Sequence, residues 1–422
     1  MKVKFVSLLL ILFLCSLSGV VCEKNIKDDE AIFSSCLKQC GVAPELFPKS
    51  TAYGGTPTNI NLTPFVALLV GTVSECQINT KCTAVIISKN FLLSAAHCIQ
   101  YAIKPDNNCF IGPEEGELVD FRPNEITIFT GISNLDNAST GHASQVKKIS
   151  RLSRYYKTKN NSNNTRSFSD LALIELYNEL NISLNTRPIC IPNNFNETFG
   201  NPVYFSGFGK SRSLLNDRPP AVGDKLHFSG QLHTVQLSFS SPELCHTLGT
   251  PSNENYDICA GRKDAGISKG DSGGPLVHYE NSRAFLVGIS STASAPADKN
   301  LTQQALNKDE YPDSFVRVSR HCQWLKDVSK VECIPFGLQL PEECRERALR
   351  ILKSNKNKHG HKIDVGASLT NCGMVPKHFF MIGTYAHWVW DHSLPYPSKF
   401  REKTQVKEED KSIFQRFLNL FG

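Results

Sequence analysis

Between Pro64 and about Val318 the sequence is a succession of short apolar, β-branched runs, separated by stretches rich in Asn, Ser, Gly and Pro. The runs are PFVALLV, TAVIIS, EITIFTG, DLALIEL, PVYFSGFG, RAFLVGIS and SFVRV. Each run has the length of a strand, and each interruption has the composition of a turn. This pattern predicts an all-β barrel or sandwich and not alternating β and α units. One helix of modest length, HCQWLKDVSK, is expected to close the region.

Beyond Val331 the pattern changes. PEECRERALRILKSN predicts an amphipathic helix, and a Lys/His-rich linker, the aromatic run FFMIGTYAHWVW and a last helical pattern, SIFQRFLNLF, follow it. We therefore expect residues 331–422 to form a separate helical or irregular C-terminal extension of unknown role. Its aromatic run is either a partner site or packs against the β region. The HGHK stretch with Cys372 matches no tetrahedral ligand spacing, so no metal is expected.

The N-terminus has the pattern of a secretory signal peptide. Lys2 and Lys4 precede the apolar run VSLLLILFLCSLSGVVC, which ends in small residues, and we expect cleavage near Cys22, so that residues 1–22 are removed. The alternative is an uncleaved membrane anchor, because the run is nearly long enough to span. No later segment could span a bilayer, and the mature form is expected to have no membrane contact.

Cysteine usage and glycosylation sequons agree with a secreted, extracellular protein. Of the 15 cysteines, Cys15 and Cys22 lie in the predicted signal peptide, which leaves an odd number for the mature chain and so one thiol unpaired or shared with another chain. Asn-x-Ser/Thr sequons occur at Asn61, Asn137, Asn160, Asn163, Asn181, Asn196 and Asn300. The net charge of +6 is mild and no basic block is interleaved with aromatics, so no nucleic-acid partner is expected.

Three short motifs carry the residue types of acyl transfer by serine. LLSAAHC contains His97, SDLALIEL contains Asp170, and KGDSGGPL contains Ser272. A serine hydroxyl is a poor nucleophile at neutral pH; it needs an imidazole to take its proton and a carboxylate to orient that imidazole. Alone, each residue could be a packed histidine, a turn aspartate or a loop serine. Together, in this chain order, they indicate a catalytic triad.

At these residues the chain resembles the trypsin/chymotrypsin family of serine endopeptidases, and the resemblance covers Ala52 to Lys330. It implies two packed antiparallel β-barrels, with His97 and Asp170 in the first and Ser272 in the second. It also implies that the backbone N–H groups of Gly270 and Ser272 form the oxyanion hole. No cofactor is implied. The predicted domains are therefore a signal peptide (1–22), a pro-segment (23–51), a protease domain (52–330) and the C-terminal extension.

The same resemblance implies three disulfides and one supporting serine. Cys82 with Cys98 matches the bridge that fixes the histidine loop, and Cys245 with Cys259 matches the bridge before the active serine. Cys190 matches the cysteine that tethers a pro-segment, with Cys36 or Cys40 as its partner. Ser291 falls where a serine contacts the buried aspartate and lines the path of the substrate.

The specificity pocket departs from the family pattern. Gly266, six residues before Ser272, stands where trypsin-like enzymes carry the aspartate that selects Arg or Lys. The family's final strand places Asp313 on the opposite wall of the pocket, so we expect Asp313 to give a weaker and broader preference for basic side chains. The alternative is that Asp313 only caps a turn after Pro312.

The activation site also departs from the pattern. In the family, the N-terminus freed by cleavage pairs with the aspartate before the nucleophile, here Asp271. The matching start is Ala52, but Thr51 precedes it and the nearest basic residue, Lys49, lies too early for a trypsin-like cut. Either another protease cuts after Thr51, or the oxyanion hole forms differently, or the domain never matures.

These observations predict a secreted serine endopeptidase that acts on a protein or peptide substrate, and an activating protease is its further partner if the chain is cut after Thr51. The alternative is a catalytically inactive homologue, which would serve as a secreted binding or regulatory module. The complete set of triad residues favours the first prediction. The altered activation site and pocket favour the second.

Overall fold

The computed structural model describes most of the region between Cys36 and Cys344. The described residues are 36, 39–42, 56–74, 78–103, 117–135, 141–152, 169–211, 227–228, 230–246, 255–263, 265–281, 283–293, 308–342 and 344. They all belong to one compact unit, residues 36–349; residues 1–35 together with 350–422 make up a second unit. The predicted signal peptide, Ala52 and the predicted helix SIFQRFLNLF therefore lie outside the described residues.

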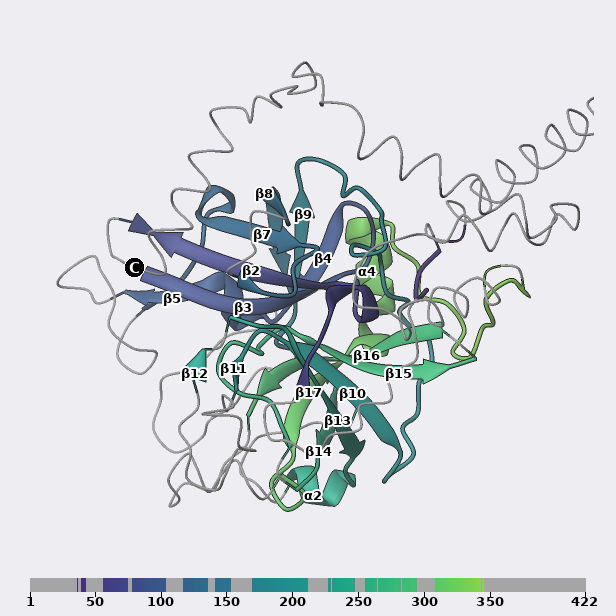
Figure 1. The fold of residues 1–422 in the computed structure, drawn as a ribbon. Helices are drawn as coiled ribbons and strands as arrows, with labels where there is room; N and C mark the ends of the chain where they lie inside the picture. The colour runs from purple at the N-terminus through teal and green to yellow at the C-terminus, as the bar shows by residue number, and fades with distance from the viewer. Residues whose placement is uncertain are drawn as a thin grey trace, which may run out of the picture. The chain divides into compact units, whose positions relative to one another are not determined.

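Six strands from the first half of the unit close into a barrel (Figure 1). They are β2 (Val66–Val73), β3 (Ile78–Ile86), β4 (Phe91–Ser94), β7 (Ile126–Thr130), β8 (His142–Arg151) and β9 (Ala172–Leu176), in the closed order β2-β3-β4-β9-β8-β7. All neighbouring strands are antiparallel. The barrel form of the fold prediction is thus confirmed for this half, and closure leaves no unpaired sheet edge.

A second antiparallel barrel follows in the chain. Its strands are β10 (Pro202–Gly207), β13 (His233–Phe239), β14 (Asp257–Gly261), β15 (Pro275–Glu280), β16 (Arg283–Thr292) and β17 (Asp313–Arg317). Their order is β13-β10-β15-β16-β17-β14, and a β13–β14 pairing closes the ring. The short strand β1 (Thr56–Pro57) pairs with β13 on this second barrel, although β2, the next strand along the chain, belongs to the first.

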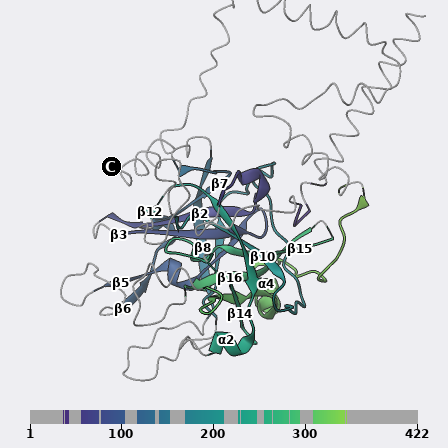
Figure 2. The same ribbon diagram turned by 60° about the horizontal axis from the view of Figure 1, so that its bottom comes forward.

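Shorter elements connect and cover the barrels (Figure 2). They are β5 (Gln100–Ile103), β6 (Glu117–Asp120), β11 (Lys210–Ser211), β12 (His227–Phe228), α2 (Pro242–His246), α4 (Cys322–Ser329), and the 3-10 turns η1 (Ile60–Leu62), η3 (Ala96–Ile99), η4 (Pro123–Glu125) and η6 (Val318–His321). Helix α4 is the predicted closing helix, and Lys330, in the left-handed conformation (φ 61°), caps its C-terminal end. None of the helices among the described residues is long and apolar enough to cross a membrane.

Each barrel has its own apolar core. Strand residues of the first barrel such as Leu69, Ile86 and Ile128 are fully buried, and Phe205 with Phe285 are buried in the second. The β-branched and aromatic residues of the predicted runs fill these interiors because alternate positions of each strand point inward. The runs that the sequence shows are therefore the linings of two barrels.

Residues just beyond α4 pack against the second barrel. A disulfide joins Cys322 to Cys333, and Ile334 pairs with Pro192 in an isolated parallel β-bridge. The centroids of the Phe336 and Phe285 rings lie 5.1 Å apart. A further disulfide joins Cys344 to Cys36. The predicted boundary at residue 330 marks the end of the strand pattern, whereas packing against the second barrel continues beyond it at Ile334 and Phe336.

Candidate active site

His97 lies in η3, directly after β4. The buried residues Ala95 and Ala96 lead into this turn, and the neighbouring Cys98 is bridged to Cys82 on β3, as the sequence predicts. The bridge fixes the turn against the first barrel. Cys82, His97 and Cys98 are close enough to share a metal ion, but both sulfur atoms are bonded to each other and are not available as thiolate ligands.

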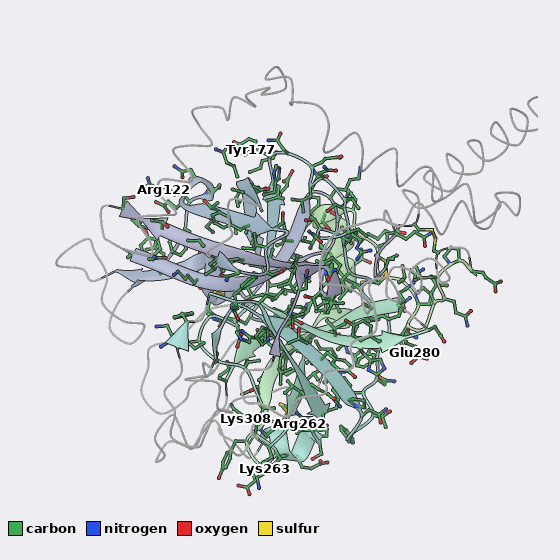
Figure 3. The ribbon with its side chains drawn as sticks, in the orientation of Figure 1. Arg122, Tyr177, Arg262, Lys263, Glu280 and Lys308 are labelled. Carbon is green, nitrogen blue, oxygen red and sulfur yellow. A yellow bond between two sulfur atoms is a disulfide. The ribbon has the colours of Figure 1, made fainter. Side chains whose placement is uncertain are left out.

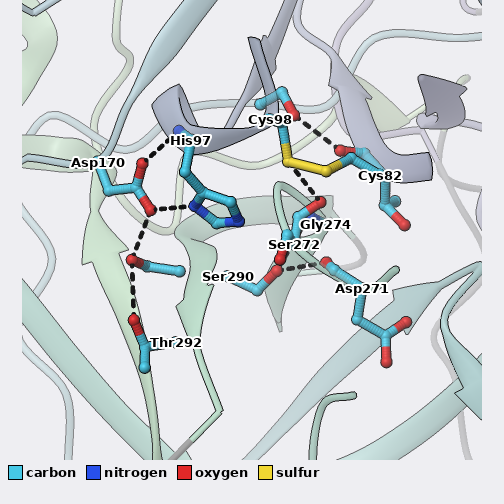
Figure 4. Close-up of polar contacts among 12 residues, drawn as sticks. Cys82, His97, Cys98, Asp170, Asp271, Ser272, Gly274, Ser290 and Thr292 are labelled. Carbon is cyan, nitrogen blue, oxygen red and sulfur yellow. Dashed lines mark hydrogen bonds and ion pairs between the residues drawn. A yellow bond between two sulfur atoms is a disulfide. The ribbon is translucent and has the colours of Figure 1, made fainter. Parts of the chain in front are cut away.

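Asp170 lies two residues before β9 and holds His97 by two hydrogen bonds (Figure 4). Its Oδ1 accepts from the His97 backbone N–H at 2.9 Å, and its Oδ2 lies 2.6 Å from the ring Nδ1. The Ser291 hydroxyl, from β16 of the second barrel, donates to the same Oδ2 at 2.7 Å, so the predicted contact of Ser291 with the aspartate is confirmed. One carboxylate thus orients the imidazole and joins the two barrels.

The environment of Asp170 favours its ionised form. Burial alone would raise the pKa of this carboxyl, but the positive charge and hydrogen bonds of His97 and the hydrogen bond from Ser291 outweigh it and lower the pKa. A carboxylate that remains charged can keep the His97 proton on Nδ1 and direct Nε2 away from itself.

Ser272 lies in a tight turn between Gly270 (φ 101°) and Gly273 (φ 82°), both in conformations that favour glycine. The Ser272 carbonyl accepts a hydrogen bond from the backbone N–H of Thr83 at 2.9 Å, and it lies 3.6 Å from the Cys98 sulfur. The turn of the second barrel that carries Ser272 is therefore attached to β3 and to the residue next to His97. The structure brings the three predicted residues into one region (Figure 4).

Thr83 is a residue of this site that the sequence analysis did not single out. Its hydroxyl donates to the Gly270 carbonyl at 3.0 Å and accepts from the Phe208 N–H at 3.2 Å. Its own carbonyl accepts from the Ser94 hydroxyl at 2.9 Å. Because Gly270 is the predicted oxyanion residue, Thr83 positions that peptide from the opposite barrel. In sequence it is one threonine in a strand run, and no local signal distinguishes it.

The Ser290 hydroxyl holds the other end of the turn. It donates to the Asp271 carbonyl at 2.5 Å and accepts from the Gly274 N–H at 3.1 Å. The residue is fully buried near the C-terminal end of β16. These bonds fix the backbone on both sides of Ser272.

The Asp271 carboxylate is buried and is held by neutral donors. Oδ1 accepts from the Gly209 N–H at 2.9 Å, and Oδ2 accepts from the Ser268 N–H and hydroxyl at 2.8 and 3.0 Å. Among the described residues no ion pair reaches this group. Burial raises the pKa of Asp271 to about 7, and the Ser268 and Gly209 bonds offset only part of that rise. Its predicted partner, Ala52, lies outside the described residues.

The structure brings Gly266 and Asp313 together, but it also adds a third residue. The Lys308 ammonium forms a buried ion pair with the Asp313 carboxylate; the two side chains are 2% and 0% exposed. Asp313 also accepts a hydrogen bond from the Ile267 N–H at 2.7 Å. Asp313 begins β17, and the carboxylate expected to receive a basic substrate side chain is already paired within the chain.

The remaining predicted bridges are present. Cys245 is bonded to Cys259, and Cys190 is bonded to Cys40 and not to Cys36. The Arg283 guanidinium lies beside the Cys40–Cys190 pair and donates to the Gln339 carbonyl at 3.2 Å. The unassigned cysteines Cys76, Cys109 and Cys372 lie outside the described residues.

We compared the sequence with known proteins and found similar proteins in insects and mammals. The chain is 25% identical over 294 residues to phenoloxidase-activating enzyme 1 of Spodoptera litura, covering 68% of this chain and 69% of that protein. It is 24% identical over 335 residues to phenoloxidase-activating factor 3 of Holotrichia diomphalia, covering 74% and 80%. Mannan-binding lectin serine protease 1 of Mus musculus is 25% identical over 66% of this chain, and the match spans only 36% of that protein's length.

Among solved structures, the scabies mite inactivated protease paralogue S-I1 is 21% identical and aligns with a TM-score of 0.48 over 66% of this chain and 99% of its own. The family model described as Trypsin matches residues 52–325, which is well over half of the chain and includes both barrels. On this match the chain belongs to the trypsin family of serine proteases.

Proposed function

We propose that this chain is a secreted serine endopeptidase. In this proposal the Ser272 hydroxyl attacks the scissile carbonyl, and His97 takes its proton and then passes it to the leaving amine. Asp170 orients His97, and the backbone N–H groups of Gly270 and Ser272 bind the oxyanion of the tetrahedral intermediate. Gly266, Ser291 and Asp313 are the proposed pocket residues.

The observation that carries the proposal is the double hydrogen bond between Asp170 and His97. With Nδ1 bonded to Oδ2 at 2.6 Å and the backbone N–H bonded to Oδ1 at 2.9 Å, the imidazole has one orientation and one neutral tautomer. That tautomer carries the basic lone pair on Nε2, the nitrogen that a serine nucleophile needs. The hydrogen bonds of Thr83 and Ser290 support a fixed turn around Ser272.

Secretion and activation are part of the same proposal. Residues 1–22 would direct export, and cleavage after Thr51 by another protease would free the Ala52 ammonium to pair with Asp271. A buried carboxylate with only neutral partners is the group that such a cation would neutralise. Two relatives are named as phenoloxidase-activating proteins, which supports a protein substrate that is activated by limited cleavage.

The test is covalent labelling by a serine-directed fluorophosphonate. The secreted protein is labelled before and after engineered cleavage that leaves Ala52 as the N-terminus, with Ser272→Ala and His97→Ala as variants and heat-unfolded protein as the control. We expect labelling of the processed wild type only, lost in both variants. Absence of labelling in every folded form would refute the proposal.

A second candidate is a catalytically inactive homologue that acts as a binding or regulatory module. The observation that favours it is the Lys308–Asp313 pair, which fills the neighbourhood of Gly266 where a substrate side chain is expected. On this alternative the processed protein stays unlabelled, although its circular dichroism spectrum is that of a folded β protein.

A further inference from the structure

Lys308 and Asp313 are unusual among the charged residues of the described structure, because both side chains are essentially inaccessible to water. Lysine is almost never fully buried unless it is paired. Lys308 lies in the second barrel next to Gly261 of β14, near Arg262 (Figure 3). Its ammonium reaches Asp313 at the start of β17, which pairs with β14.

The stem of Lys308 runs directly over Gly266. A Cβ atom added to Gly266 would lie 2.8 Å from the Lys308 Cγ, 3.0 Å from its Cε and 2.5 Å from the Asp313 Oδ2. The space that a side chain at position 266 would use is therefore occupied by the lysine stem and the carboxylate. Gly266 is the proposed base of the specificity pocket, six residues before Ser272.

The charges in this pocket balance without a substrate. Lys308 supplies one positive charge to Asp313, and the Ile267 N–H fills another acceptor position of the same carboxylate. Asp271 lies near enough for Asp313 to raise the pKa of its carboxyl, but it is itself held by Gly209 and Ser268. The Asp313 carboxylate, which a second cation would meet beside Gly266, is already paired with Lys308.

We infer that Lys308 is the specificity-determining residue of this pocket. Its side chain occupies the position of a substrate's basic side chain, so that the protein rejects arginine and lysine before the scissile bond. To bind in this pocket, a substrate arginine or lysine would have to break the buried Lys308–Asp313 ion pair, which costs at least about a hundredfold in affinity. That the space beside Gly266 receives a substrate side chain rests on the proposed function. That Lys308 fills this space is seen in the structure and does not depend on the proposed function.

The test is binding of benzamidine, a small planar cation, measured by titration calorimetry on the full-length protein. In Lys308→Ala the vacated space keeps the Asp313 carboxylate, so benzamidine should bind at least about tenfold more tightly than to wild type. Two control variants should bind benzamidine no more tightly than wild type. Lys308→Met keeps the bulk of the side chain without its charge. Lys308→Ala/Asp313→Asn keeps the vacated space without the carboxylate. Equal binding by wild type and folded Lys308→Ala, or binding by neither, would overturn the inference.

A measurement on the wild type covers the case in which Lys308→Ala does not fold. Acetylation by an N-hydroxysuccinimide ester, mapped by mass spectrometry, should modify the exposed Lys326 and leave Lys308 unmodified in the native protein. Modification of Lys308 at the rate of Lys326 would refute its burial in the pocket.

All binding measurements are repeated in Ser272→Ala. This variant has no proposed nucleophile, so benzamidine binding gained by Lys308→Ala must persist in it. Gained binding together with absent fluorophosphonate labelling would uphold the role of Lys308 and refute the proposed enzyme activity. Fluorophosphonate labelling of the processed wild type, together with benzamidine binding that Lys308→Ala leaves unchanged, would uphold the proposed enzyme activity and refute the role of Lys308.

Discussion

The buried Asp271 carboxyl should make the unprocessed protein less stable as the pH rises. Its pKa is raised from an ordinary 3.8 to about 7, chiefly by burial. Between these two values the folded protein keeps a proton on Asp271 that the unfolded chain has released. The contribution of Asp271 to the free energy of unfolding is therefore full below pH 4 and is lost as the pH rises to 7.

The size of the effect follows from the shift. A rise of the pKa from 3.8 to about 7, at about 1.4 kcal/mol for each pH unit, gives about 4 kcal/mol over the whole interval, and the part between pH 5 and pH 8 gives about 3 kcal/mol. The assay is urea unfolding of wild type and Asp271→Asn at several pH values between 5 and 8, with the free energies compared at each pH. Wild type should lose about 3 kcal/mol relative to the variant between pH 5 and pH 8.

The control is Glu332→Gln at the protein surface. Lys326 lowers the pKa of Glu332 through a hydrogen bond and its charge, so Glu332 is ionised in both the folded and the unfolded chain above pH 5 and this comparison should stay constant between pH 5 and pH 8. After cleavage before Ala52, the new ammonium should lower the pKa of Asp271 and flatten its profile. A difference between wild type and Asp271→Asn that does not vary from pH 5 to pH 8 in the unprocessed protein would refute the reasoning.

Two further predictions concern the backbone around the site. Thr83→Val keeps the shape of the side chain but leaves the Gly270 carbonyl and the Phe208 N–H without their partner, so the free energy of unfolding should fall by about 2 kcal/mol or more, measured by urea unfolding. Thr80→Val, on the same strand but partly exposed, should change it by less than about 0.5 kcal/mol, and equal effects of the two would contradict the role of Thr83. Cleavage by any protease between residues 42 and 56 should leave both fragments in one band on a gel until disulfides are reduced, because two bridges hold the N-terminal segment. Separation without reductant would show that these bridges are absent.

Much of the fold was predictable because its signals are local. The strands are short apolar, β-branched runs bounded by turn residues, and the HCQWLKDVSK helix closes the region, so both can be predicted without knowing which strand pairs with which. The contact of Ser291 with Asp170 and the Cys82–Cys98 bridge could be predicted as well, but from family resemblance and not from local patterns.

The residues that escaped prediction act through tertiary contacts. Lys308 lies in the stretch QQALNKDEYPD, where a lysine among turn residues indicates a solvated loop, and only the folded chain brings it over Gly266. In sequence, Thr83 is an ordinary strand threonine, and only its hydrogen bond to the Gly270 carbonyl in the folded chain distinguishes it. The Cys36–Cys344 bridge has no local signal either, because its two ends are 308 residues apart.

The pairing of β1 with β13 sets an order for folding during synthesis. The first barrel is built entirely from residues 66–176, so it can close while the rest of the chain is still being made. Strand β1 is synthesised earlier, but it cannot form its sheet pairing until His233 and Thr234 of β13 have been synthesised. Cys36 waits longer still, with Cys40 only four residues away as a competing thiol. Correct oxidation of the newly made protein therefore requires that Cys36 remains reduced, or is reshuffled, until nearly the last of the barrel unit has emerged.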